Sequence, residues 1–487
     1  MCPNFTTHLI EIILIILLSN VHCPLNRLVL KVTPQLVLVF FSYQIVYSGV
    51  LLYNGIDVMY RKLISLAMAS CATFAFAQVD VDALATEVET DVIEWRHHFH
   101  EFPELSNREF NTAKYVANYL TSLGLEVETG VASTGVVAIL DSGKPGPVVA
   151  LRADMDGLPV KEQGDLSYRS TQMGEYNGQE VPVMHACGHD THMAMLMGAA
   201  KILTSIKGEF KGKVKFIFQP AEEGAPAGET GGAEVMVKQG VLKNPDVDVI
   251  FGLHISSNTD VGTVRYNSGG TMAAVDPFKI VIHGKQAHGA YPWKSVDPVV
   301  TAAQMIMSIQ TIVSRELKLI DDAAVVSIGS IHGGNRSNII PNEVEMVGTI
   351  RTLNKAAREH IYESLPRKVN AIAESMGAKA ELTLPLDYYY PITYNDPALT
   401  QAMVPTIQRT AGAENAIVSK PVTGAEDFSF FQEKVPGLYV WVGGKPLDVS
   451  EQDSPAHHTP EFYVDDSGMK LGVKLLTNFT LDYMAQH

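Results

Sequence analysis

Nine consecutive residues, MHACGHDTH (Met184–His192), bring together one thiol, three imidazoles and one carboxylate. Only Gly188 separates Cys187 from His189, and a glycine permits a turn from which both side chains converge before a helix begins. A soft thiolate beside imidazoles suits Zn²⁺, Co²⁺ or Ni²⁺, and suits the harder Mn²⁺ less naturally. The string therefore predicts a metal site; the structural alternative is a buried thiol with surface histidines nearby.

A pair of carboxylates ends a second informative string, FIFQPAEEG (Phe216–Gly224). Its apolar start predicts a buried strand, and open α/β sheets bind ligands at the carboxyl ends of their parallel strands. Successive side chains point in different directions, so one of Glu222 and Glu223 can bind a metal while the other faces a substrate. For an isolated pair of this kind, a solvated turn is the alternative.

Three more histidines stand where they could join such a site. His254 ends the apolar run Val249–Leu253 and repeats the pattern of a polar group at the carboxyl end of a strand. A core histidine with satisfied hydrogen bonds is the alternative for His254. His457 and His458 lie in the string AHHTPEF near the C-terminus.

The elements that must position these residues alternate between strand and helix patterns. Short apolar runs bounded by turn residues predict buried strands, with helical stretches between them. This alternation predicts the α/β fold class, with a mostly parallel sheet covered by helices on both faces. The predicted strands are 135–140, 148–152, 214–219 and 249–253, and the predicted helices are two within 81–123 and one at 192–206.

From Asp276 the pattern changes to strand, helix, strand, strand, helix, strand. That order is the plan of a ferredoxin-like domain. After about Tyr390 the first pattern returns, so we expect a small domain inserted into a larger one. The expected boundaries are 78–275 for the first part of the larger domain, 276–390 for the insertion and 391–487 for the second part.

Residues 1–77 differ from the rest because they carry only six charged side chains. The segment that begins at Met59 has a basic start, an apolar stretch and a small-residue cleavage site, as in a secretory signal peptide. We therefore expect 59–77 to be a signal peptide, 1–58 to be a spurious upstream extension, and the protein to be exported, either periplasmic or secreted. The alternatives are membrane segments at 9–18 and 36–53, which are short or interrupted by polar residues, and a lipid anchor at Cys71.

The charge of the chain argues against a nucleic-acid-binding protein, and its cysteine content argues against a fold held by internal disulfides. The formal net charge is −16, and no basic stretch could neutralise a run of phosphates, which argues against nucleic acid as a partner. Without residues 1–77, the chain holds 33 basic and 51 acidic side chains, and Cys187 is its one cysteine. A single cysteine cannot form an internal disulfide, so it is inert, reactive or a metal ligand.

Taken together, these strings resemble the M20 metallopeptidase family, in its aminoacylase, hippurate hydrolase and auxin-conjugate hydrolase branch (the amidohydrolase subfamily). The resemblance covers about residues 90–480, and the motifs agree in order and spacing. The motifs are RHHFHEFPEL (96–105), LRADMDGLP (151–159), MHACGHDTH, QPAEEG, GLH (252–254), GKQAHG (284–289), SNIIP (337–341), GAEDFS (424–429) and HHTPEF.

The resemblance implies a site with two divalent metal ions (Zn, Mn, Co or Ni). Glu222 matches the family's general base, and Asp156 matches a carboxylate that orients a ligand or the metals. His458 is assigned over His457 because it stands two residues before the proline of the matching H-T-P-x-F string. The implied ligands are Cys187 as a bridging thiolate, His189, Glu223, His254 and His458.

The resemblance also assigns roles to three residues of the inserted domain. His288 would donate a hydrogen bond to the oxyanion, often from a partner subunit's lid. Asn338 and Arg351 would recognise the free carboxylate of the amino acid, a task suited to the bidentate fork of arginine. A turn residue and a surface strand residue are the alternatives for these two. A homodimer through the inserted domain is a further expectation.

The expected function is exported, metal-dependent hydrolysis of the amide bond of N-acyl amino acids. The alternative within the same class is a dipeptidase or carboxypeptidase that acts on short peptides. A cysteine hydrolase with Cys187 as nucleophile would be inactivated by alkylation but would survive chelation. A catalytically silent binding protein with this fold is disfavoured, because Glu222 and every expected ligand are present.

Overall fold

The computed structural model describes residues 79–320 and 323–487. The described residues all belong to one of the two units into which the chain divides, Val79–His487. The predicted signal peptide and the possible lipid anchor at Cys71 lie outside the described residues. No helix in the described part is both long enough and apolar enough to cross a membrane.

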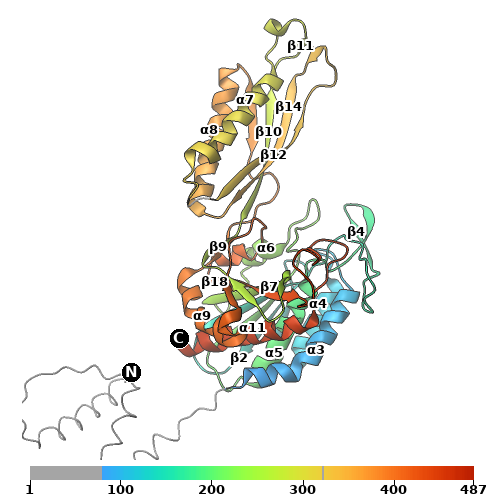
Figure 1. The fold of residues 1–487 in the computed structure, drawn as a ribbon, viewed down its shortest axis with the longest axis vertical. Coiled ribbons are helices and arrows are strands. Elements are labelled where there is room, and N and C mark those ends of the chain that lie inside the picture. The colour runs from blue at the N-terminus through green and yellow to red at the C-terminus, as the bar shows by residue number, and fades with distance from the viewer. Residues whose placement is uncertain (1–78, 321–322) are drawn as a thin grey trace, which may run out of the picture. The chain divides into compact units, whose positions relative to one another are not determined.

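An eight-stranded sheet forms the centre of the larger domain (Figure 1), in the order β1-β2-β6-β3-β7-β18-β8-β17. The four central strands β6, β3, β7 and β18 run parallel to one another. The predicted α/β class with a mostly parallel sheet is confirmed. The strands are β1 (Glu126–Val131), β2 (Gly135–Asp141), β3 (Val148–Asp154), β6 (Lys213–Gln219), β7 (Val249–Asp260), β8 (Val264–Tyr266), β17 (Ala416–Val418) and β18 (Gly437–Lys445).

Helices cover both faces because alternate residues of each central strand are apolar and point to opposite sides. In β3, Val149 and Leu151 join a core built with one group of helices, whereas Val148 and Ala150 join a core on the other face. The first group is α3 (Val81–Glu101), α4 (Phe110–Ser122), α5 (His189–Ser205), α9 (Pro397–Ala411) and α11 (Met469–Gln486), and the second is α6 (Gly232–Lys238) and α10 (Ser429–Gln432).

Helix α5 begins three residues earlier than the expected start at His192, so His189 is its first residue. Gly188 caps the helix with φ of 97°, in the left-handed region that favours glycine. A Cβ at this position would lie 2.4 Å from Cγ2 of Ile255. The glycine therefore lets the ligand string pass close to β7 and places His189 in the first helical turn.

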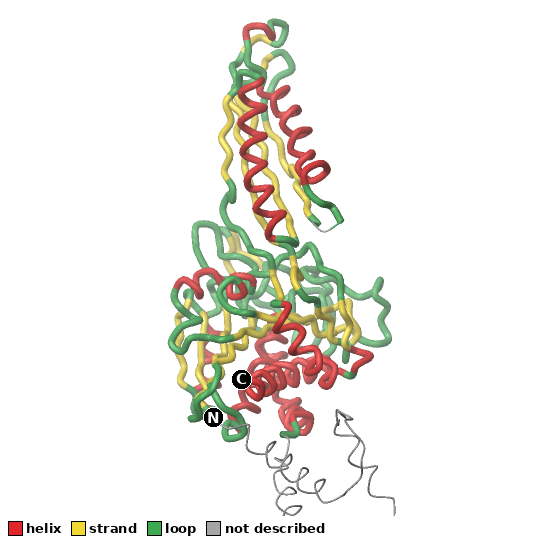
Figure 2. The backbone as a smooth tube through the Cα atoms, turned by 90° about the vertical axis from the view of Figure 1, so that its left-hand side faces the viewer, coloured by secondary structure: helices red, strands yellow, loops and turns green. Residues whose placement is uncertain are grey.

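The inserted domain has a four-stranded antiparallel sheet in the order β12-β14-β10-β15. Two helices pack on one face (Figure 2), and alternate residues of β10 (Phe278, Ile280 and Ile282) join their core. This arrangement confirms the predicted ferredoxin-like domain. Its elements are β10 (Ala274–His283), α7 (Pro298–Thr311), β12 (Ala324–His332), β14 (Glu343–Thr352), α8 (Lys355–Ser375) and β15 (Lys379–Thr383).

The chain enters and leaves the inserted domain side by side. Val275 at the start of β10 pairs with Tyr390 on the returning segment through two backbone hydrogen bonds of 2.9 and 3.0 Å. Three pairs of short antiparallel strands complete the described fold: β4 (Met173–Tyr176) with β5 (Gln179–Pro182), β9 (Gly269–Met272) with β16 (Thr393–Asn395), and β11 (Ala287–His288) with β13 (Ile339–Ile340).

Candidate metal centre

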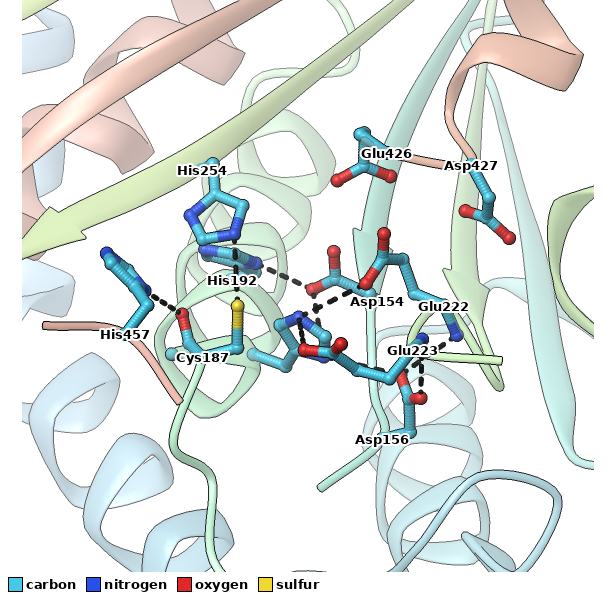
Figure 3. Close-up of polar contacts among 12 residues, drawn as sticks. Asp154, Asp156, Cys187, His192, Glu222, Glu223, His254, Glu426, Asp427 and His457 are labelled. Atoms are coloured by element: carbon cyan, nitrogen blue, oxygen red, sulfur yellow. Dashed lines mark hydrogen bonds and ion pairs between the residues drawn. The ribbon is translucent and has the colours of Figure 1, made fainter. Parts of the chain in front are cut away.

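The thiol of Cys187 points toward the ring of His254, with the carboxylates of the site on its other side (Figure 3). Its Sγ atom is 3.4 Å from Nε2 of His254 and 3.3 Å from Nε2 of His458. The ligand atoms offered by Cys187, His189 and Glu223 lie within 4.8 Å of one another. The structure thus brings together all five residues expected to bind metal, from four segments that are far apart in sequence.

His254 is held with one ring nitrogen facing the thiol. Its Nδ1–H donates to the carbonyl oxygen of Ile255 at 2.5 Å, which leaves the lone pair of Nε2 toward Cys187. Burial and the neighbouring ring of His192 lower the pKa of His254 well below its ordinary value. The imidazole is therefore neutral, which is the form that binds metals.

His457 and His458 differ in what their ring nitrogens contact. Nε2 of His457 accepts the backbone N–H of Ser257 at 3.1 Å, so its Nδ1–H donates to the carbonyl oxygen of Cys187 at 3.1 Å. His458 has φ of 65° and directs Nε2 at the Cys187 thiol and at Oε1 of Glu223, 3.1 Å away. His458 is thus free to bind a metal, whereas the backbone occupies both ring nitrogens of His457.

His189 supplies the clearest sign that the site is built for cations. Its Nε2 is buried and has no hydrogen-bond partner in the described part of the chain. The nearest carboxylate oxygens, from Glu222 and Glu223, lie 3.8 and 4.0 Å away, beyond hydrogen-bonding distance. Burial lowers the pKa of His189, but Asp154 and other carboxylates outweigh it and raise this pKa to about 10, so the site favours a positive charge at this position.

Asp156 fixes the turn that carries the two glutamates. Its Oδ1 accepts the backbone N–H of Glu222 at 3.1 Å, and its Oδ2 accepts that of Glu223 at 3.0 Å and the hydroxyl of Ser106 at 2.7 Å. Oδ1 also lies 3.3 Å from Nδ1 of His189. Asp156 therefore orients a predicted ligand and the predicted base together.

Glu222 is buried beside the ligands without touching the thiol. Its carboxylate lies near two other buried acids, Glu426 and Asp427, and these three oxygens lie within 4.8 Å of one another. Burial, followed by repulsion from Glu426 and Glu223, raises the pKa of Glu222 well above its ordinary value. A carboxyl with a raised pKa holds a proton more readily, as a general base that returns its proton must.

Sequence reasoning did not single out Asp154 and His192. Nδ1 of His192 donates to Oδ1 of Asp154 at 2.6 Å, and its Nε2 accepts the backbone N–H of Ile255 at 2.8 Å. Both ring nitrogens of His192 therefore have hydrogen-bond partners, so His192 and Asp154 help to hold the site together and His192 has no nitrogen left for a metal. The string LRADMDGLP contained Asp154, but only the second aspartate was assigned a role.

Sequence reasoning also missed a buried charge cluster centred on Arg152. The guanidinium donates to Asp154 at 2.7 Å, to Glu426 at 2.9 Å and to Asp427 at 3.0 Å. Its Nε donates to the side-chain oxygen of Gln219 at 2.8 Å. This buried cation lies among three carboxylates and offsets part of their negative charge. The motif GAEDFS, which contains the two later acids, was the available signal.

Within the part of the chain that the structure describes, none of the three predicted residues of the inserted domain contacts the Cys187 site. His288 and Asn338 are exposed. They are adjacent because β11 pairs with β13 and Gly289 donates its N–H to the carbonyl oxygen of Asn338 at 2.8 Å. Arg351 lies on β14, opposite Val275 of β10. The ten residues of β10 extend over roughly 30 Å, and β11 follows their far end (Figure 1).

His97 and His100 of helix α3 make contacts that support the fold. His100 is buried, with Nδ1 2.9 Å from Asp190 and Nε2 3.2 Å from Glu162. His97 lies 2.7 Å from Asp466. The contact with Asp190 ties α3 to the first turn of α5, where the ligand string ends.

The donor set of thiol, imidazoles and carboxylates, together with the unpartnered Nε2 of His189, fits a dinuclear metal centre, as predicted. The sequence profile of peptidase family M20/M25/M40 matches residues 150–482. The chain belongs to this family. The M20 membership confirms the resemblance drawn from the motifs and identifies the chain as a hydrolase of amide bonds.

Relatives of this M20 chain match it over most of its length. Thermostable carboxypeptidase 1 of Saccharolobus solfataricus is 41% identical over 79% of this chain and 93% of its own. N-acetylcysteine deacetylase of Bacillus subtilis is 37% identical over 78% of this chain and 93% of its own. The crystal structure of the YXEP protein of Bacillus subtilis, described as a dinuclear metal binding peptidase, matches with a TM-score of 0.68 and 33% identity, over 82% of this chain and 100% of that one.

Proposed function

We propose that this M20 hydrolase binds two divalent cations through Cys187, His189, Glu223, His254 and His458, and that it cleaves the amide bond of N-acyl amino acids. The observation that carries the proposal is the position of Glu222. Its buried carboxylate lies 3.8 Å from Nε2 of His189 and makes no contact with the Cys187 thiol, so it is available for proton transfer. The similarity to an N-acetylcysteine deacetylase supports an acyl amino acid as substrate.

In this mechanism Glu222 transfers the proton and Asp156 positions Glu222. Two divalent cations, when bound, acidify an attacking water and polarise the scissile carbonyl. Glu222 accepts the proton of that water and returns it to the departing amine nitrogen, so that acid and amine are released. Asp156 holds the turn that carries Glu222 through two backbone N–H groups.

The inserted domain would complete the site. Nδ1 of His288 accepts a hydrogen bond from the backbone N–H of Ala290 at 3.0 Å, so the ring proton is on Nε2. This Nε2–H group can donate a hydrogen bond to a developing oxyanion. Because β10 is long and β11 lies beyond it, we propose that His288 and Asn338 act on the site of a second copy of the chain in a homodimer. Arg351 would bind the substrate carboxylate.

A carboxypeptidase or dipeptidase activity is the second candidate. It is favoured by the similarity to a thermostable carboxypeptidase, which is 41% identical to this chain. Both activities use the same metal centre and the same base. They differ in whether the group on the amide carbonyl is an acyl chain or an aminoacyl residue.

We also propose that the protein is exported by a signal peptide that begins at Met59. Support comes from the sequence pattern alone, with its basic start, apolar stretch and small-residue cleavage site. N-terminal sequencing of the protein recovered outside the cytoplasm tests this: a first residue at or near Gln78 is expected. An intact segment upstream of residue 78, or retention in the cytoplasm, would contradict export.

A hydrolysis panel tests the main proposal. Purified enzyme is incubated with acetyl-, benzoyl- and indoleacetyl-amino acids and with dipeptides, before and after removal of metal by a chelator. We expect highest kcat/KM on an N-acyl amino acid, loss of activity after chelation, and recovery with Zn²⁺, Mn²⁺, Co²⁺ or Ni²⁺. Preference for dipeptides would support the second candidate, and activity that resists chelation but is lost on alkylation of Cys187 would refute the metal mechanism.

A further inference from the structure

The turn that carries Glu222 is anchored by side chains from three distant segments. Glu109 accepts the backbone N–H of Ala221 at 2.9 Å, and Asp156 accepts those of Glu222 and Glu223. The third anchor is Tyr390, whose hydroxyl donates to the carbonyl oxygen of Glu222 at 2.7 Å. From the sequence alone, Tyr390 marked only the end of the inserted domain.

The bond from Tyr390 acts on the peptide group between the two glutamates. That group is planar, so its C=O and N–H turn together. Tyr390 holds the C=O of Glu222, and Asp156 holds the N–H of Glu223 at 3.0 Å. With both ends held, the plane cannot rotate, and the directions in which the two side chains leave the backbone are set.

The surroundings of Tyr390 keep it in place and keep it protonated. Its backbone pairs with Val275 where the chain enters and leaves the inserted domain, and its ring packs edge-on against Phe430 with centroids 6.3 Å apart. Burial and the nearby carboxylates of Asp427 and Glu222 raise the pKa of the Tyr390 phenol well above its usual value. The hydroxyl therefore remains protonated, and so a hydrogen-bond donor, at neutral pH.

We propose that Tyr390 is a positioning residue for the reaction: by fixing the Glu222–Glu223 peptide, it aims the carboxylate of Glu222 at the attacking water. This inference rests on the proposed role of Glu222 as general base. It also means that the junction of the inserted domain supplies part of the machinery that holds the base. A small error in the direction of a base lowers the rate of proton transfer without changing substrate binding.

The variant Tyr390→Phe removes the hydroxyl and keeps the ring. Loss of one neutral hydrogen bond predicts a fall in kcat of about tenfold, with KM within about twofold of the wild-type value and two metals per chain. Tyr389→Phe is the matched control, since its ring also packs on Phe430 but its hydroxyl is not bonded to the Glu222 turn. We expect the control to keep wild-type kcat. Unchanged kcat in Tyr390→Phe would overturn the inference.

A double-mutant cycle with Glu222→Gln separates positioning from a general structural effect. If Tyr390 acts through Glu222, adding Tyr390→Phe to Glu222→Gln leaves the residual rate unchanged within about twofold. An equal tenfold fall in both backgrounds would overturn the inference. Wild-type activity of Glu222→Gln alone would instead refute the proposed function, so the two failures are distinguishable.

Discussion

Nε2 of His458 lies 3.3 Å from Sγ of Cys187, although 271 residues separate them in sequence. The backbone N–H of His458 also donates to the carbonyl oxygen of Ala186 at 2.8 Å. The two segments are therefore joined by their backbones as well as by the side chains of Cys187 and His458. The left-handed backbone of His458, with φ of 65°, is unusual for a residue other than glycine. Such geometry is retained where surrounding contacts demand it, which agrees with a ligand role.

Replacement of Glu222 by glutamine separates proton transfer from metal binding. Glutamine keeps the shape of the side chain but cannot accept and return a proton, so we expect kcat to fall by about 10²–10⁴-fold. Metal content measured by mass spectrometry should remain at two ions per chain. The comparison variant Glu223→Gln should lose metal as well as activity. A Glu222→Gln enzyme with wild-type turnover would refute the assigned role.

The two adjacent histidines near the C-terminus should behave differently. His458→Ala removes a predicted ligand, and we expect it to lower metal occupancy to about one ion per chain when the protein is dialysed against metal-free buffer. His457→Ala removes hydrogen bonds to Ser257 and Cys187, both to backbone atoms, and should retain two ions. The reverse pattern of occupancy would show that His457 is the ligand.

The guanidinium of Arg152 should be essential for stability. Arg152→Met leaves Asp154, Glu426 and Asp427 buried without their cation, and removing one partner of a buried ionic cluster costs about 3–5 kcal/mol. The free energy of unfolding in urea measures the effect. Arg409→Met breaks the exposed pair with Asp482 and should cost less than about 1 kcal/mol. Equal losses in the two variants would contradict this account.

Glu316 predicts a pH dependence of stability in the inserted domain. Partial burial raises the pKa of Glu316, but hydrogen bonds from Lys368 and Ser364 outweigh it and lower the pKa to about 2. A lowered pKa adds stability that is complete above the unfolded value of 4.5 and is lost as the pH falls toward 2. Glu316→Gln should therefore lower Tm by roughly 2 °C at pH 7, with a difference that shrinks below pH 4.5.

Thermal unfolding of Glu316→Gln is compared with that of Glu359→Gln, whose side chain is exposed on the same helix as Lys368. The Tm of the Glu359→Gln variant should differ little from wild type at any pH between 7 and 3. A Glu316 effect that is constant over this range would contradict the assigned cause.

Local sequence patterns were sufficient for the parts of the site that lie within short strings. Cys187 and His189 are two residues apart, and Glu222 and Glu223 come three and four residues after the end of the predicted strand β6, so residue type and strand position together indicated a ligand site. The order of strands and helices likewise predicted the ferredoxin-like insertion, because each of these elements has its own local pattern of apolar residues. Apolar periodicity is a local property that the sequence displays directly.

The rest depended on contacts between distant segments. Arg152 meets Glu426 across 274 residues, and no local pattern pairs an arginine on a strand with a particular later acid. His192 stands in the ligand string, yet its nitrogens bond to Asp154 and to the backbone of Ile255, which only the fold can reveal. Tyr390 reaches Glu222 in the same way, across 168 residues.

Anomalous X-ray diffraction from crystals of the purified enzyme, recorded at the absorption edge of its metal, tests the central claim most directly. We predict two peaks, both within bonding distance of Sγ of Cys187, with His189, Glu223, His254 and His458 around them. Active enzyme whose crystals show no peak at Cys187, or whose peaks lie elsewhere, would contradict the account.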